Sequence, residues 1–267
     1  MFISGLLSSL LYFIAGIFLG YNLFNGKIIQ DKPNDKVLGI ASLALILHSI
    51  ILFSDIITPS GLNPSIVNSF SLVAWIIVLL FLVAELRKPV ETLGIFIFPI
   101  AGLALLLELL FPGQMNISNR SFELEVHIFL SLLSYGLLAI AAAQSVLLLV
   151  QTHYLKNKQP GGFIRSLPPL QSMETLLFQI IKVGFSLLTL ALLSGFIFLD
   201  NIFAQHLVHK TVLSMVAWLL FAILLWGRWH FGWRGKKAVN FTLVGFIFLM
   251  LAYFGSKIVL EIILQRV

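Results

Sequence analysis

The stretch "WGRWHFGWRGKK" (226–237) joins two long apolar runs and decides how the chain is organised. It holds three tryptophans, one histidine and four cations. The runs on either side, about 211–229 and 239–262, can each cross a bilayer, since a helical span needs roughly 20 mostly apolar residues. Tryptophan, Lys and Arg gather where such helices leave a membrane. The stretch therefore predicts a turn between two transmembrane helices, and it leaves His230 unexplained.

The same pattern of apolar run and short polar turn recurs along the whole chain. Of its residues, 59% are hydrophobic and 10% are charged, whereas a soluble domain is roughly 45–50% apolar and about 25% charged. We therefore expect an all-α, polytopic transmembrane helix bundle that forms a single integral membrane domain over 1–267. The eight expected spans are about 4–24, 37–57, 67–85, 91–111, 125–149, 177–199, 211–229 and 239–262.

Lys and Arg are distributed unevenly between the expected loops. The odd-numbered loops, counted from the N-terminus, carry twelve of these cations and the even-numbered loops carry two. Short cytoplasmic loops hold the excess of Lys and Arg in membrane proteins, so we expect both termini to lie outside the cytoplasm. The net charge of +6 is then a topology signal, and we expect a lipid bilayer rather than nucleic acid as the partner of these cations.

Several kinds of chemistry are excluded by what the sequence lacks. There is no cysteine, so a disulfide, a thiolate metal site and a cysteine nucleophile are all impossible. The sequence also has no phosphate-binding glycine loop, no GxSxG and no HExxH, which are the patterns of common nucleotide-binding and hydrolytic sites. We therefore expect a protein without catalytic residues.

Ionisable side chains inside a span cost free energy and are candidates for function. His48 lies near the middle of the second span, and His127 lies just inside one end of the fifth. Lys182 lies in the sixth span and could face an anionic group such as a propionate. Each has a structural alternative, namely a neutral hydrogen-bonded histidine or a lysine that extends to the headgroups. His153, His206 and His209 lie at span ends or in loops, and we expect them to be solvated.

A stripe of small residues follows His127 at helical spacing. Its members are Ser131, Ser134, Ala141 and Ser145. Such a stripe allows close packing of a neighbouring helix, or it could let a flat ligand lie beneath the imidazole.

Four segments of the second half of the chain occur in an order and spacing that one known family shares. They are "VHIFLSLLSYGLLAI" (126–140), "LPPLQSMETLLFQIIKVGFSLLTLALLSGFIF" (167–198), "TVLSMVAWLLFAILLWGRWHFGWRGKK" (211–237) and "LAYFGSKIVL" (251–260). The chain resembles the cytochrome c assembly protein family, and within it the bacterial inner-membrane branch called YpjD. The resemblance is best over 125–260 and looser over the first four spans.

The resemblance implies a haem-binding protein of the bacterial inner membrane with periplasmic termini. It would bind haem b and assist haem handling or cytochrome c assembly, with other maturation or membrane-complex proteins as partners. His127 matches the family's outer-face histidine that opens a span before "SY", and His48 matches a histidine inside an early span, so both are expected metal ligands. His230 lies about one turn beyond a second in-span histidine position, where this chain has Trp226.

The chain also departs from the family pattern. The family's haem exporters and synthases carry a tryptophan-rich outer motif ending in "WDPKET", whereas "DNIFAQHLVHKT" (200–211) has no tryptophan and keeps only "KT". The C-terminal "LEIILQRV" (260–267) lacks the family's second outer histidine. We therefore expect haem handling without synthase turnover.

Helix geometry separates the two expected ligands. His48 is nine residues from the outer end of its span and His127 only two, which makes a depth difference of about 10 Å. Two imidazole nitrogens on one iron lie only about 4 Å apart, so we expect separate positions for the two histidines. Two other functions stay open: a transporter of another small molecule that uses His48 and Lys182, and a structural partner in a membrane complex.

Overall fold

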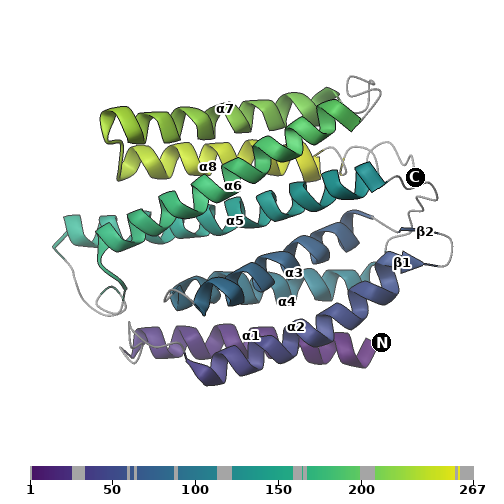
Figure 1. The fold of residues 1–267 in the computed structure, drawn as a ribbon. Helices are drawn as coiled ribbons and strands as arrows, with labels where there is room; N and C mark the ends of the chain where they lie inside the picture. The colour runs from purple at the N-terminus through teal and green to yellow at the C-terminus, as the bar shows by residue number, and fades with distance from the viewer. Residues whose placement is uncertain are drawn as a thin grey trace. The chain divides into compact units, whose positions relative to one another are not determined.

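The computed structural model describes residues 2–25, 34–58, 61–62, 65–86, 90–112, 122–158, 164, 167–198, 208–255 and 258. Within these ranges the chain is almost entirely helical (Figure 1). The long helices are α1 Phe2–Phe24, α2 Asp35–Ile56, α3 Ile66–Glu85, α4 Gly94–Leu110, α5 Phe122–Lys156, α6 Leu170–Phe198, α7 Val208–Phe231 and α8 Lys236–Met250. The short elements are the 3₁₀ turn η1 Glu91–Leu93, the π-helical turn η3 Leu251–Gly255, and the strands β1 Ile57–Thr58 and β2 Gly61–Leu62, which pair antiparallel.

The prediction of eight membrane spans is confirmed by helix length and composition. Eight described helices are long and apolar enough to cross a bilayer. α4 joins η1 to make one span over Glu91–Leu110, and α8 joins η3 to make another over Lys236–Gly255. The side of the membrane on which the termini lie stays a prediction.

The chain forms two compact units, and each is described by itself. Unit 1 comprises Met1–Ser118 with Val150–Pro169, and unit 2 comprises Asn119–Leu149 with Leu170–Val267. The single domain expected from the sequence stays a prediction.

Unit 1 is a bundle in which α1 packs on α2 and α4, while α3 packs on the same two helices. Small residues let α1 and α4 approach closely, as is usual between membrane helices. The Ser9 hydroxyl donates to the Gly102 carbonyl at 2.8 Å. A side chain at Gly16 would lie 2.9 Å from the Pro99 ring. Tyr12 and Phe98 lie in the interior between these helices, and neither side chain is exposed.

In unit 2, α5 and α6 run antiparallel, because contacts from His127, Ser134 and Gln144 meet successively earlier residues of α6. α7 and α8 pack against each other. Ser134 of α5 donates to the Gly184 carbonyl of α6 at 2.9 Å. A Cβ atom added at Gly184 would lie 2.9 Å from the Leu138 side chain. Ser134, Ala141 and Ser145 are fully buried. These members of the small-residue stripe therefore lie in tightly packed protein, with Ser134 at the contact with α6.

The stretch 226–237 is the turn between α7 and α8, as the sequence predicts. The Trp233 ring lies directly on Gly227, and Arg228 donates to the Trp233 carbonyl at 3.2 Å. The chain reverses at Gly235, whose φ of 58° suits glycine. The Gly235 amide donates to the Glu174 carboxylate of α6 at 2.7 Å. This hydrogen bond to Glu174 therefore connects the turn to α6.

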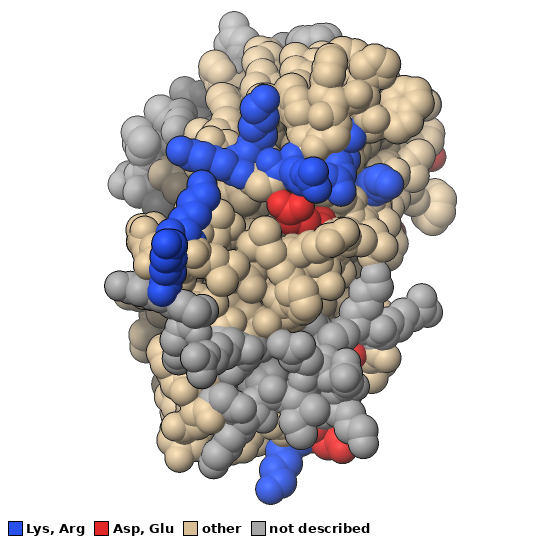
Figure 2. Space-filling model, turned by 90° about the vertical axis from the view of Figure 1, so that its left-hand side faces the viewer, with Lys and Arg blue, Asp and Glu red and all other residues tan. Residues whose placement is uncertain are grey.

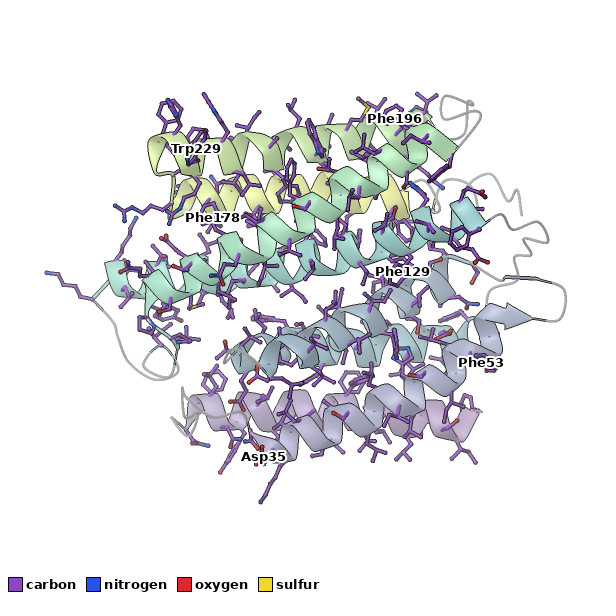
Figure 3. The ribbon with its side chains drawn as sticks, viewed as in Figure 1. Asp35, Phe53, Phe129, Phe178, Phe196 and Trp229 are labelled. Carbon is purple, nitrogen blue, oxygen red and sulfur yellow. The ribbon has the colours of Figure 1, made fainter. Side chains whose placement is uncertain are left out.

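Cations surround the α7–α8 turn, which we call the cationic end of unit 2: Arg228, Arg234, Lys236 and Lys237. Lys and Arg side chains gather on the upper part of the face seen in Figure 2. The Arg228 guanidinium lies over the Phe178 ring at 4.6 Å, and Lys237 lies over Trp233 at 5.3 Å. Trp229 is 83% exposed (Figure 3). This arrangement fits an aromatic and cationic belt at a membrane surface.

Candidate functional site at His127

His127 lies near the beginning of α5, at the end of unit 2 opposite to the cationic end. Its Nδ1 lies 2.9 Å from the Ala191 carbonyl oxygen of α6. A carbonyl oxygen only accepts hydrogen bonds, so Nδ1 carries the hydrogen. The Ser194 hydroxyl also lies 3.0 Å from Nδ1, and it donates to the same carbonyl at 2.8 Å. The ring is therefore held from one side, by α6.

The other ring nitrogen of His127 is left with a lone pair. No described residue forms a hydrogen bond to Nε2, and the side chain is partly exposed. Histidines that bind metals commonly donate their second N–H to a backbone carbonyl, which fixes the tautomer and the ring orientation. His127 has this arrangement, with Nε2 as the available ligand atom.

Gly195 makes room for the imidazole. A Cβ atom at this position would lie 3.1 Å from Cε1 and 3.4 Å from Nδ1 of His127. Gly184 and Gly195 are eleven residues apart, which places them on one face of α6. That face packs on α5 along its length, so the same packing that joins the helices also positions the histidine.

His48 lies in unit 1 and is held on both sides. Its Nε2 is 2.8 Å from the Ser71 hydroxyl, and its Nδ1 is 3.4 Å from the Tyr12 hydroxyl. The residue is completely buried. Both nitrogens of His48 therefore face protein hydroxyls, and its expected role as a metal ligand stays a prediction.

His230 lies in the last turn of α7, far from His127 within unit 2. The Trp218 indole donates to Thr189, which puts Trp218 level with the part of α6 that holds His127. His230 is twelve residues further along α7, or about 18 Å towards the cationic end. There it is exposed and stacks on Trp226 at 5.6 Å. His127 and His230 therefore cannot share one iron.

Lys182 lies on a different face of α6 from the His127 contact. It is nine residues before Ala191, which corresponds to a rotation of about 180° and a rise of about 14 Å. Lys182 is exposed, and Gln179 and Ser186 share its side of the helix. An anionic group beside Lys182 would thus lie away from the His127 imidazole.

The remaining histidines lie near helix ends or outside the described residues. His153 and His209 are exposed, and His153 lies 3.1 Å from the Asn157 amide in unit 1. His206 and most of the loop 200–211 lie outside the described residues, as does the C-terminal stretch 259–267. Among the described residues no group of three or more His, Cys, Asp or Glu could hold a metal ion.

Sequence comparison decides which family these features belong to. The model of the family described as "Cytochrome C assembly protein" matches residues 38–264. The chain belongs to the cytochrome c assembly protein family. The family assignment expected from the second half of the chain is confirmed, and it extends back to the second span.

Two named groups of this family are represented among the relatives. Inner membrane protein YpjD of Escherichia coli K12 is 38% identical over 226 residues, which cover 84% of this chain and 86% of the relative. Cytochrome c biogenesis protein CcsA of Chlamydomonas reinhardtii is 30% identical over 146 residues, covering 53% and 40%. CcsA of Microcystis aeruginosa is 22% identical over 244 residues, covering 72% and 74%. No solved structure matches the chain.

The comparisons and the eight spans agree on the location of the protein. The YpjD relative is named as an inner membrane protein, and the chain has the helices for a multi-pass membrane protein. The predicted location in the inner membrane is confirmed.

Proposed function

We propose that the protein handles haem b in the inner membrane during cytochrome c assembly, without catalytic turnover. The observation that carries this proposal is the His127 imidazole, whose Nδ1–H is fixed by the Ala191 carbonyl while Nε2 stays available. Family membership supports haem as the ligand class. Haem supplies an iron with axial positions that accept an imidazole nitrogen.

His127 is the residue that would hold the haem iron, through Nε2. Ala191 and Ser194 hold its ring in a fixed orientation.

An absorption spectrum of protein purified from haem-replete membranes tests this proposal. We expect a Soret band in the wild type that is lost in His127→Ala and kept in His48→Ala. Phe129→Ala is a matched control, because Phe129 lies two residues further along α5 and is 62% exposed on the far side of the helix (Figure 3). A spectrum that stays flat after hemin is added would contradict the proposal and leave the transporter and structural roles.

A further inference from the structure

Unit 1 contains a row of buried polar side chains that is separate from the candidate site at His127. Its four members come one each from α1, α2, α3 and α4: Tyr12, His48, Ser71 and Glu108. None is more than 1% exposed. Polar and ionisable groups buried within membrane spans are costly and usually serve a function.

Each of these side chains contacts the next one, so the four form a continuous row. The Tyr12 hydroxyl lies 3.4 Å from Nδ1 of His48, and Nε2 of His48 lies 2.8 Å from the Ser71 hydroxyl. Ser71 also lies beside the Glu108 carboxyl group. Neither oxygen of Glu108 reaches hydrogen-bond geometry with any described partner. Glu108 is thus a fully buried carboxyl group with unused hydrogen-bonding capacity at the end of the row.

The described surroundings of Glu108 provide no cation to balance a carboxylate. α1, α3 and α4 contain no Lys or Arg, and the single such residue of α2, Lys36, is twelve residues before His48, or about 18 Å along the helix. A buried carboxylate without a cation is strongly disfavoured relative to the neutral acid. The titratable groups near Glu108 are Tyr12, His48 and, at the edge, Asp55, while Glu85 and Glu91 are buried near the other ends of α3 and α4.

The row of polar side chains reaches a half-buried residue at one end of unit 1 and apolar side chains at the other. Asp55 is half-buried at the end of α2, lies close enough to Glu108 for their charges to interact, and is seven residues from His48 on the same face of the helix. On the other side the Tyr12 ring stacks on Phe98, and Phe98 meets Phe81 edge to face at 5.3 Å. These two phenylalanines are at most 2% exposed, so the row ends at an apolar barrier.

We propose that Glu108, with Ser71, His48 and Tyr12, is a proton-binding site of unit 1 that exchanges with water at the Asp55 end. On release, the O–H bond of Glu108 breaks and the proton passes to the Asp55 carboxylate or to water beyond it, leaving the Glu108 carboxylate. On loading the proton returns by the same path. A proton fits better than a metal ion, because no group of three or more His, Cys, Asp or Glu among the described residues could hold one.

The directions of the hydrogen bonds also favour a proton-binding site at Glu108. Ser71 can donate to Nε2 of His48, and Nδ1–H of His48 to the Tyr12 hydroxyl. The Ser71 oxygen is then left to accept from the Glu108 acid that lies beside it. The hydrogen bonds donated by Ser71 and His48 therefore both run in the direction of Tyr12. Ser71 and His48 therefore stabilise the charge that appears when Glu108 releases its proton, since the hydrogen bonds can shift towards the carboxylate.

Infrared spectroscopy of the protein in lipid tests the proposal. Subtracting the Glu108→Gln spectrum from the wild type should leave the carbonyl band of a protonated carboxylic acid at neutral pH, and this band should shift when the protein is moved to D₂O. Glutamine has nearly the same shape and no charge, so the variant is expected to fold. Glu123→Gln, at an exposed position of α5, should retain the band.

Asp55→Asn tests the route. We expect the Glu108 band to persist in this variant and its exchange in D₂O to slow severalfold. The proposal is overturned if the difference spectrum shows no protonated acid, if the band never exchanges, if Glu123→Gln removes it as well, or if Asp55→Asn leaves the exchange rate unchanged.

Discussion

Replacing Gly195 with alanine should weaken haem binding without touching the ligand itself. The added Cβ would lie 3.1 Å from Cε1 and 3.4 Å from Nδ1 of His127, whereas carbon atoms in good contact are roughly 3.5–4.0 Å apart. The imidazole must move by a few tenths of an ångström, away from the face that carries the Ala191 carbonyl. The 2.9 Å hydrogen bond to that carbonyl would then lengthen and bend.

The size of the effect follows from what that hydrogen bond does. Losing a partner that orients a metal-binding histidine typically lowers metal affinity about 10- to 100-fold. The bond is stretched rather than removed here, so we expect the low end of this range. An increase in haem Kd of about tenfold corresponds to roughly 1.4 kcal/mol.

Titration of the purified protein with haem measures this change. Gly39→Ala is the control, because a Cβ atom at Gly39 meets nothing within 4 Å and this glycine lies in unit 1. We expect Gly39→Ala to bind haem like the wild type. Wild-type affinity in Gly195→Ala, together with loss of binding in His127→Ala, would refute the idea that α6 positions the ligand.

Three further changes test the description of unit 2. Gly227→Ala should lower the free energy of unfolding by about 1–3 kcal/mol, because the new methyl group overlaps the Trp233 ring; an unchanged melting temperature would contradict this packing. Glu174→Gln should cost about 1 kcal/mol in the same assay, since the amide of Gly235 loses a charged acceptor at 2.7 Å. His230→Ala should leave haem titrations unchanged, because its ring is exposed at the cationic end; a weaker affinity would show that it takes part.

Hydropathy located the spans well because a membrane span has a minimum apolar length. The fourth expected span, 91–111, corresponds to Glu91–Leu110. Helix ends were less well defined by the same signal. α5 continues to Lys156 and α6 begins at Leu170, several residues outside the apolar runs, because polar residues with good helix propensity extend a helix beyond the membrane.

The sequence identified the histidine of the candidate site but not the groups that position it. The sequence singled out His127, but the groups that hold it are the Ala191 carbonyl and the space at Gly195, which are properties of the backbone. Glu108 lies near the end of an apolar run in the sequence, and the structure buries it to 1% exposure. Its position beside Ser71 depends on how α3 packs on α4, which no local pattern specifies.

Chemical rescue of His127→Gly tests the central claim most directly. Removing the side chain should abolish the Soret band, and added imidazole should restore it by occupying the vacated space and binding the iron. Phe129→Gly serves as the parallel sample, in which imidazole should not be needed. Restoration of the band in His127→Gly is the result we predict. A His127→Gly protein that binds haem like the wild type without imidazole would show that the iron is held elsewhere.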